Sequence, residues 1–484
     1  MKRRRAVVPG AVLALAFVML SACAVVAAPG IPPSVPSVPS GTETAGIAWT
    51  PVESDTANGW ACSTIARTPA YEPDYFVAEG GDDRHDGRDR ARPFATLQRA
   101  ADVAQAGEVV WVRGGGYDAQ VTFEGRGRPD APIVFESHPG ECAVLDGARS
   151  ESRSAVRFVD ARHYLFRHFV VRNSTTQGIL LLRSHDNVLS DLHVHHNRLS
   201  GIQSVAGDRN RFTRFVTHDN YDPPYGEDAD GIGISSGSDN RIDRCVAFRN
   251  SDDGVDAWRS FGTVITRCVA FENGLQGGDG NGFKAGGAVA NRTVLRSNLS
   301  FGNVGHGFTY NLGTQVTFEH NTAYGNGGYG FVAGRARLRN NLAFGDVQGP
   351  FFDAGSNETA GNSWSLGIAD PRFADTRPSS AAFLSLRPDS PAIDAGTTIG
   401  LPFAGAAPDL GAVPFGDTLG TVVGTRLDGH PARREAPHRP PDRRRASNAT
   451  GAYTITNAAI RTAGSTGSAA LAPHAATEAS AAPR

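Results

Sequence analysis

The chain has 484 residues, including 57 glycines and 29 prolines, and a formal net charge of −2. This balanced charge argues against a nucleic-acid-binding protein, which needs a basic surface. The length suits one extended domain with appendages, and no apolar run is long enough to span a membrane.

Residues 1–23 have the features of an export signal, with a basic start at Lys2–Arg5 and an apolar run at Ala11–Leu20. The last four residues, Leu-Ser-Ala-Cys, resemble a bacterial lipoprotein box, in which a lipidated Cys23 would tether the protein to a membrane. Ordinary cleavage near Ala27–Ala28 would instead release the protein. Both alternatives predict a protein that works outside the cytoplasm, either secreted or as a cell-surface lipoprotein.

Residues 24–70 are rich in Pro, Ser and Thr and are predicted to form a linker. The predicted catalytic domain spans residues 71–416 and opens with a strand near residue 74. A helix is expected between Pro93 and Gly107. Its apolar stripe would cap the open N-terminal end of the fold, and comprises Phe94, Leu97, Ala101 and Ala104. The acidic segment 80–89 is interpreted as a solvated loop rather than a second cation site.

A ladder of glycines, each followed by an apolar residue, organises the centre of the chain. Its members are Gly178, Gly201, Gly231, Gly254, Gly282, Gly307 and Gly330. Their separations are 23, 30, 23, 28, 25 and 23 residues. A period of this length with short strands predicts an all-β fold, a parallel β-helix of about ten coils.

Side chains alternate between the two faces of a strand, so positions counted from each glycine fall into columns. The first position after the glycine is predicted to face the core, and includes Ile232, Val255, Phe283 and Phe308. The second position faces outward and places Asp256 beneath Lys284. The position before the glycine makes Asp230 and Asp253 vertical neighbours.

Four carboxylates therefore share one patch: Asp230, Asp252, Asp253 and Asp256. Unpaired carboxylates this close raise one another's pKa unless something neutralises them. Ca²⁺ accepts several carboxylate ligands in a loose geometry, so the patch predicts a calcium site. Asp228 lies two residues before Asp230 and is an alternative ligand, although the shared column favours Asp230.

The order DADG, SDDGVD and NGFKAGG, read from Asp228 to Gly287, resembles the active-site segment of polysaccharide lyase family nine pectate lyases. The resemblance covers about residues 75–344 and implies a right-handed parallel β-helix. It also implies that Asp230, Asp252, Asp253 and Asp256 bind Ca²⁺, and that Lys284 is the catalytic base. In β-elimination, a cation on the uronate carboxylate spreads the developing charge while the base removes the neighbouring proton.

Two other functions compete with this one. Asp230, Asp252 and Asp253 with the motif around His306 suggest a polygalacturonase-type hydrolase, but His306 lies two coils beyond the acidic pair instead of one. A non-catalytic surface β-helix would use the carboxylates only to stiffen the solenoid. Lys284 argues against that function, because a stiffening site gains nothing from a cation facing its carboxylates.

The expected partner is an acidic polysaccharide, pectate or a related uronate polymer, bound by a monomer. Residues on the same side of the strands are candidates to line the groove: Trp258, Arg259, Tyr310, Asn311 and Arg335. The preferred polymer and the mode of attack stay open.

Further columns are interpreted as structural. Asn187, Asn210, Asn240 and Asn291 each lie nine residues after a ladder glycine and are expected to hydrogen-bond along a turn. An aromatic column is expected to stack in the core, and contains Phe248, Phe271, Phe301, Tyr324 and Phe344.

Cys245 and Cys268 lie one coil apart in a core column and are predicted to be buried thiols, with a disulfide as the alternative. Cys62 and Cys142 are a possible pair in an oxidising compartment. The last residues, 417–484, are low in apolar content and are predicted to be a mostly disordered tail.

Overall fold

The structure is a computed structural model, which describes residues 72–125, 127–148, 153–275, 277–287 and 290–420. The predicted export signal, the linker, Cys23, Cys62 and nearly all of the predicted tail lie outside these residues. Within them, no helix has the length and apolar character needed to cross a bilayer.

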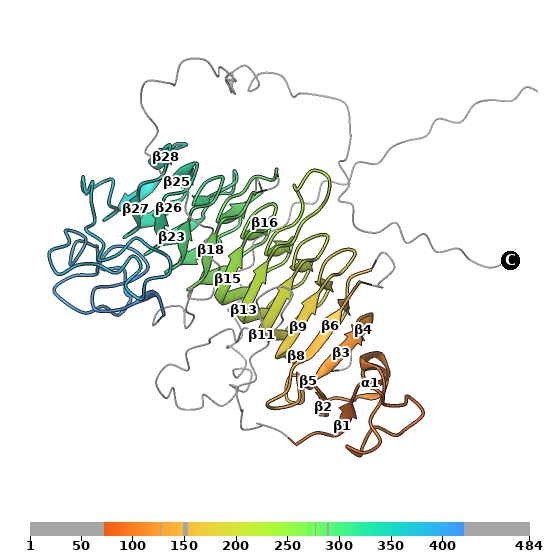
Figure 1. Cartoon of the computed structure of the whole chain (residues 1–484). Coiled ribbons are helices and arrows are strands. Elements are labelled where there is room, and N and C mark those ends of the chain that lie inside the picture. Colours follow the sequence, from red (N-terminus) through yellow and green to blue (C-terminus); the bar gives the residue numbers. More distant parts are fainter. Residues whose placement is uncertain (1–71, 126, 149–152, 276, 288–289, 421–484) are drawn as a thin grey trace, which may run out of the picture. The chain divides into compact units, whose positions relative to one another are not determined.

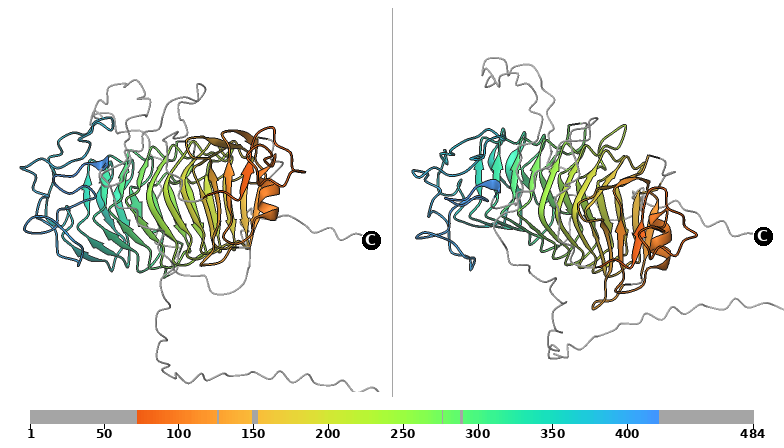
Figure 2. Two further views of the ribbon diagram at one scale, coloured as in Figure 1. Left: turned by 90° about the horizontal axis from the view of Figure 1, so that it is seen from below. Right: turned by 60° about the horizontal axis from the view of Figure 1, so that its bottom comes forward.

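Ten strands, one from each coil, form a continuous parallel sheet. They are β4 (Val121–Glu124), β7 (Val156–Val159), β10 (Ile179–Leu182), β12 (Ile202–Val205), β14 (Ile232–Ser235), β16 (Val255–Trp258), β19 (Phe283–Gly286), β22 (Phe308–Thr309), β25 (Tyr329–Ala333) and β28 (Gly349–Asp353). Each pairs in parallel with the strand one coil away, as between Ile202 and Ile232. The predicted parallel β-helix of about ten coils is therefore confirmed, and Figures 1 and 2 show the coils stacked along one axis.

The remaining strands form a nineteen-stranded sheet that covers the other sides of the coils. Three are long and bend midway: β11 (Val188–His195), β13 (Arg211–His218) and β15 (Arg241–Phe248). Asp191, Arg214 and Arg244 mark the bends, because each has a positive φ of 51–54°. The other strands are β1 (Tyr75–Val77), β2 (Val109–Val112), β3 (Gly115–Asp118), β5 (Ile133–Ser137), β6 (Ala143–Asp146), β8 (Tyr164–Arg167), β9 (Phe169–Arg172), β17 (Val264–Thr266), β18 (Val269–Phe271), β20 (Val294–Arg296), β21 (Leu299–Phe301), β23 (Thr317–Glu319), β24 (Thr322–Tyr324), β26 (Arg337–Arg339), β27 (Leu342–Phe344) and β29 (Glu358–Ala360).

Helix α1 (Leu97–Val103) lies at the N-terminal end of the solenoid (Figure 1). Its first turn is capped by the Thr96 hydroxyl, which accepts a hydrogen bond from the Arg99 amide at 3.1 Å. All four residues of the predicted apolar stripe are buried in the core cluster of the first coils. Carboxylates of the acidic loop before the helix hydrogen-bond to the backbone. Asp83, for example, accepts hydrogen bonds from the amides of Ala95 and Thr96.

The predicted register of the core is correct. Ile232, Val255, Phe283 and Phe308 have no exposed surface, and the rings of Phe283 and Phe308 stack with centroids 4.9 Å apart. Because a one-residue slip would turn every such side chain outward, this burial fixes the outward columns that carry the candidate site.

The asparagine column is confirmed at its first members. Asn187 Nδ2 donates to Asn210 Oδ1 at 3.1 Å, and the Asn210 amide donates to Asn240 Oδ1 at 2.9 Å. Two longer side-chain ladders were not predicted. One joins Asn197, Asn220, Asn250, Asn273, Asn303, Asn326 and Asp346. The other joins Asn298, Asn321, Asn341 and Asn362.

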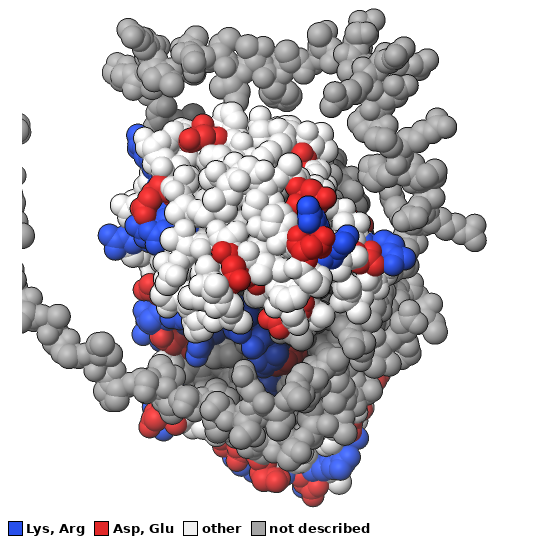
Figure 3. Space-filling view, turned by 90° about the vertical axis from the view of Figure 1, so that its left-hand side faces the viewer, with Lys and Arg blue, Asp and Glu red and all other residues white. Residues whose placement is uncertain are grey.

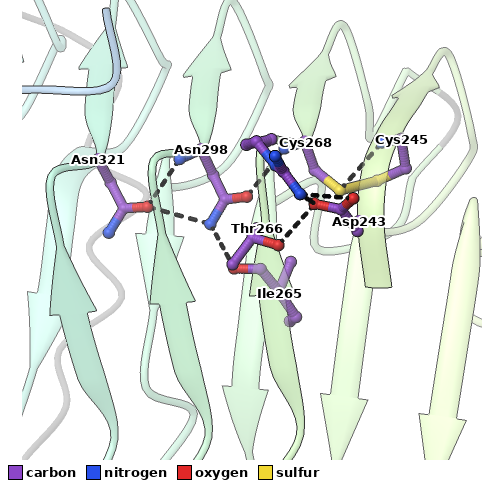
Figure 4. Close-up of a disulfide and its surroundings, with 8 residues drawn as sticks. Asp243, Cys245, Ile265, Thr266, Cys268, Asn298 and Asn321 are labelled. Atoms are coloured by element: carbon purple, nitrogen blue, oxygen red, sulfur yellow. Dashed lines mark hydrogen bonds and ion pairs between the residues drawn. A yellow bond between two sulfur atoms is a disulfide. The ribbon is translucent and has the colours of Figure 1, made fainter. Parts of the chain in front are cut away.

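The prediction of free thiols at Cys245 and Cys268 is wrong, because the two residues form a disulfide with their Cα atoms 4.5 Å apart. The bond lies at the turn where the ladder of Asn298 and Asn321 begins, and the Cys268 amide donates to Asn298 Oδ1 at 3.0 Å (Figure 4). The register of neighbouring coils brings the two Cα atoms within the range that a disulfide requires. Cys142 is also disulfide-bonded.

The predicted aromatic stack is present, but it lies in a second buried cluster and not in the main core. Phe248, Phe271 and Phe301 stack at 4.8 Å intervals, but on the outer side of the strands, because Ala247 and Ala270 beside them face the core. The segment after β29 covers this outer stack, with Phe383, Leu384 and Val413 in the same cluster. Seen from the C-terminal end, the surface is mostly uncharged and mixes acidic and basic groups (Figure 3).

Candidate functional site

The four predicted carboxylates and the lysine lie on three consecutive coils of the ten-stranded sheet. Asp230 precedes β14, Asp252 and Asp253 precede β16, Asp256 lies within β16, and Lys284 lies within β19. Asp256 and Lys284 are direct partners in the ladder of β16 and β19, as the outward column predicts. Gly233, the partner of Asp256 on β14, has no room for a side chain, since an added Cβ would collide with Gln203 Oε1 and lie 3.0 Å from Asp230 Oδ2.

Three of the carboxylates converge. Asp230, Asp253 and Asp256 each offer an oxygen, and these oxygens lie within 4.8 Å of one another. All three residues are buried, Asp253 completely. Such a set of oxygen donors is the kind that hard cations such as Ca²⁺ prefer.

Backbone and amide groups hold one side of these carboxylates. Asp253 Oδ1 accepts hydrogen bonds from the Asn281 amide at 2.7 Å and from Asn281 Nδ2 at 2.9 Å. Asp230 Oδ1 accepts a longer one from the Asp253 amide at 3.3 Å. Within the described residues, the buried oxygen Asp256 Oδ1 accepts no hydrogen bond, and the only partner of the buried oxygen Asp253 Oδ2 is the Lys284 amine at 2.9 Å. Buried acceptors left this way favour a bound cation, so the residues fit one.

The Lys284 amine lies among carboxylates on its own coil and on the preceding one. Its Nζ is 2.9 Å from Asp253 Oδ2, 3.1 Å from Asp279 Oδ2 and 3.6 Å from Asp256 Oδ2. The side chain is only 13% exposed, so its charge is compensated by these neighbours rather than by water.

Burial and mutual repulsion shift the pKa values of the acidic groups upward. Burial, increased by the charge of Asp253, raises the pKa of Asp252 to about 8. Burial, opposed by Lys284, raises the pKa of Asp256 to about 7. Burial likewise raises the pKa values of Asp230 and Asp253. For Lys284, burial lowers the pKa, but the surrounding carboxylates outweigh it and leave the pKa raised.

Asp279 was missed from the sequence. It groups with Asp252 and Asp253 as a second set of oxygens within 4.8 Å, and its amide donates to Asp252 Oδ1 at 2.7 Å. Its side chain is 66% exposed. The sequence feature that could have indicated Asp279 is its position three residues before the ladder glycine Gly282. Asp228 has the same position relative to Gly231. Asp228 itself is exposed and belongs to neither set, so the geometry favours Asp230 over it.

The residues expected to line a groove lie on neighbouring coils beside this cluster. The Arg259 guanidinium packs over the Trp258 ring, 4.8 Å from its centroid, and Trp258 is the ladder partner of Gly286 on the coil of Lys284. The Asn311 carbonyl accepts a hydrogen bond from the Gly287 amide at 2.8 Å. Tyr310 is partly buried against the core. Arg335, one coil further, is exposed.

His306 occupies the column of Asp253 and Asn281, but its contacts are structural. Its Nδ1 accepts a hydrogen bond from the Tyr329 amide at 2.9 Å, and its ring packs on that of Tyr329 with centroids 5.9 Å apart. Burial lowers the pKa of His306.

The fold and the carboxylate cluster together define a parallel β-helix with an acidic, lysine-containing site on its ten-stranded face. The chain belongs to the Pel9A-like, right-handed β-helix family, whose model matches residues 75–341. The handedness and the family predicted from the sequence are thus confirmed.

Similar proteins cover most of the chain. Pectate lyase L of Dickeya chrysanthemi is 31% identical over 384 residues, which span 70% of this chain and 89% of that protein. Pectate lyase L of Paenibacillus polymyxa is 28% identical, over 62% of this chain and 74% of that protein. The crystal structure of pectate lyase Pel9A superposes with a TM-score of 0.64 at 27% identity, over 73% of this chain and 98% of the other.

Proposed function

We propose that this protein is a Ca²⁺-dependent pectate lyase that cleaves a polygalacturonate-type chain by β-elimination. The convergence of Asp230, Asp253 and Asp256 beneath the Lys284 amine carries this proposal, because it combines a cation site and a base. Family membership and relatives named pectate lyases support a polysaccharide lyase.

Asp230, Asp252, Asp253 and Asp256 would hold the ion, with Asp279 able to join from the turn before β19. A bound Ca²⁺ would supply a Lewis acid for the uronate carboxylate, on which negative charge develops during proton removal. Gly233 lets the Asp230 carboxylate and the Gln203 side chain lie close to β14, and Asn281 orients the Asp253 carboxylate through two hydrogen bonds.

Lys284 would take the proton next to the uronate carboxylate, and the bond to the neighbouring glycosidic oxygen would then break. The amine can accept a proton only when it is neutral, and Asp253, Asp256 and Asp279 oppose its deprotonation. Neutralising these carboxylates is therefore a condition for base catalysis. Trp258, Arg259, Tyr310, Asn311 and Arg335 would contact the sugar units of a polymer that runs along the neighbouring coils.

The test is an assay on polygalacturonate that follows the absorbance of the unsaturated product, with excess Ca²⁺ and with chelator. A Ca²⁺-dependent lyase forms the unsaturated product only with the ion. Release of saturated sugars would identify a hydrolase instead. If no cleavage accompanied clear Ca²⁺ binding, the protein would be a non-catalytic β-helix.

We also propose that the protein acts outside the cytoplasm, because residues 1–23 combine a basic start with an apolar run. Mass spectrometry of the mature N-terminus would separate the two routes of export. A lipidated Cys23 in the membrane fraction would show a lipoprotein, and an unmodified protein in the medium, cleaved near Ala28, would show free secretion.

A further inference from the structure

A second cluster of metal-binding side chains lies away from the carboxylate site, at the ends of β11 and β13. His193 and His195 lie in β11, His196 follows it, and His218 ends β13 with Asp219 directly after it. His195 and His218 are ladder partners, which places the two strand ends side by side. His196 and Asp219 both have positive φ values, 56° and 52°, so the chain turns at the same point on both coils.

Three of these residues bring potential ligand atoms close together. His196, His218 and Asp219 each offer one ligand atom, and these atoms lie within 4.8 Å of one another. The bonds of a tetrahedral zinc site place two nitrogen ligands about 3.3 Å apart, so small side-chain rotations would bring the three atoms onto one ion. Imidazole with a carboxylate is a donor set for Zn²⁺ or a similar transition metal rather than for Ca²⁺.

The two other histidines support the first two. His193 Nε2 lies 2.7 Å from His218 Nε2, and His195 Nδ1 lies 2.7 Å from His196 Nδ1. The first contact leaves His218 Nδ1, which lies 2.7 Å from Asp219 Oδ2, as the candidate ligand atom of His218, and the second leaves His196 Nε2 as that of His196. Metal-binding histidines are commonly oriented by such a partner on the second nitrogen.

Packing alone explains part of this cluster. The rings of His195 and His218 stack at 5.0 Å, and His218 stacks on Phe248 at 4.6 Å, which extends the outer aromatic column by two coils. Packing gives no reason for the polar pair of His193 with His218, or for His196, whose side chain reaches solvent. That exposed position also gives an ion access to the cluster.

Arg249 is the group that a metal would have to displace in part. Its guanidinium donates to both Asp219 oxygens, Nε to Oδ1 at 2.8 Å and an NH₂ group to Oδ2 at 2.6 Å. His218 Nδ1 lies 2.7 Å from the same Oδ2. Transfer of Oδ2 from Arg249 to the ion would leave the Nε hydrogen bond to Oδ1 in place.

We propose that His196, His218 and Asp219 form a binding site for a Zn²⁺-class transition metal, supported by His193 and His195. The site is independent of the proposed calcium site, which uses carboxylates on β14, β16 and the turns beside them. It binds its ion whether or not the lyase reaction takes place.

The test uses the untagged full-length chain, metal-stripped and then saturated with Ca²⁺, titrated with Zn²⁺ by calorimetry. Co²⁺ is a second probe, whose visible absorption reports coordination. We expect one Zn²⁺ per chain at this site and at least about tenfold weaker binding in His196→Asn. Asn accepts the left-handed backbone of residue 196, so the variant removes the ring without straining the turn.

His163→Asn is the matched control, because His163 also has a positive φ, 59°, and lies outside the cluster. It should bind Zn²⁺ as the wild type does. His218→Phe separates packing from binding: it should keep the thermal stability of the stack and lose the Zn²⁺ affinity. Zn²⁺ binding unchanged in His196→Asn, for example through the histidines of the C-terminal tail, would overturn the proposal, as would no binding by the wild type.

Discussion

Lys284 is surrounded by more negative charge than its own column supplies. Asp256 was expected beneath it, but Asp253 and Asp279 lie closer to the amine, at 2.9 and 3.1 Å. These contacts show that Lys284 compensates buried carboxylates, and this effect has to be separated from the proton removal proposed for it. A substitution that changes the rate without changing the fold distinguishes them.

We expect Lys284→Ala to lower the rate of unsaturated-product formation by about 10²–10⁴-fold, the usual contribution of a general base. Lys284→Arg keeps the positive charge but cannot readily become neutral, so it should also be nearly inactive. Initial rates on polygalacturonate, with Ca²⁺ binding measured by calorimetry, check both variants. An Ala variant that retained most of the wild-type rate would show that the base lies elsewhere.

The choice between Asp230 and Asp228 can be tested with one matched pair. Asp230 is buried and its oxygens converge with those of Asp253, whereas Asp228 is exposed and lies outside the group. We expect Asp230→Asn to weaken Ca²⁺ binding by about tenfold or more, because affinity follows the number of charged ligands. Asp228→Asn should leave calorimetric binding unchanged. If Asp228→Asn weakened Ca²⁺ binding and Asp230→Asn did not, Asp228 would be the ligand instead of Asp230.

At the scale of a single element, the glycine ladder depends on close packing rather than on backbone conformation. None of its described members has a positive φ. At Gly254, an added Cβ would lie 2.7 Å from the Gly282 carbonyl oxygen and 2.8 Å from the Ala270 Cβ. The chain passes too close to its neighbouring coils there for any side chain.

Gly254→Ala is therefore expected to lower the free energy of unfolding by about 1–3 kcal/mol through overpacking. Urea denaturation measures this change. Gly116→Ala is the control, because a Cβ at Gly116 meets nothing within 4 Å. Equal stability of the two variants would mean that the ladder glycines are not required by packing.

Asp346 ends the longest asparagine ladder with a carboxylate where an amide would fit. Its Oδ1 accepts two hydrogen bonds from Asn326, at 2.9 and 2.8 Å, while burial raises its pKa to about 7. The unfolded chain ionises this group near its ordinary value of 3.8, so the folded state loses relative stability as the pH rises from about 4 to about 7.

Asp346→Asn should continue the ladder and remove this cost. At pH 8 we expect the variant to have a higher melting temperature than the wild type. The gain in free energy of unfolding should be a few kcal/mol, because a pKa change of one corresponds to about 1.4 kcal/mol. The difference should shrink toward pH 4, where both side chains are neutral. A constant difference at all pH values would show that ionisation of Asp346 is not its cause.

For the molecule as a whole, the period of the sequence predicted the coils, the core and the outward columns, because stacking of identical turns leaves little freedom. The pairing of Asp256 with Lys284 followed from that register alone. What failed depends on contacts outside a single column. The outer aromatic stack is buried because the segment around Phe383 and Val413 folds back over it. That segment lies outside the sequence repeats, so its position could not be predicted from the period.

The same limit explains the other omissions. Asp279 enters the site through the conformation of an irregular turn, and the disulfide of Cys245 and Cys268 depends on redox chemistry that column spacing does not encode. The His cluster was missed because its members are distributed between a strand and the residue after it, on two coils. The register of the coils was predictable, whereas contacts made by irregular turns and by the segment that covers the outer stack were not.

Four acidic groups buried in one place should couple the stability of the whole solenoid to pH and Ca²⁺. In the metal-free protein, burial raises the pKa of Asp252 to about 8 and that of Asp256 to about 7, from an ordinary value of 3.8. At pH values between 3.8 and these raised pKa values, the carboxyl groups are ionised in the unfolded chain but still protonated in the folded chain. Metal-free stability should therefore fall as the pH rises from about 4 to about 8.

At the proposed site, Ca²⁺ would bind the ionised carboxylates, so the stabilisation it provides should grow over the same range. We expect the increase in melting temperature on addition of Ca²⁺ to be larger at pH 8 than at pH 5 in calorimetric scans. Asp253→Asn should reduce that increase at pH 8, because it removes the completely buried carboxylate of the converging group. Asp228→Asn should leave it unchanged. A Ca²⁺ effect of equal size at both pH values, or one that survived Asp253→Asn, would place the stabilising ion at another site on the chain.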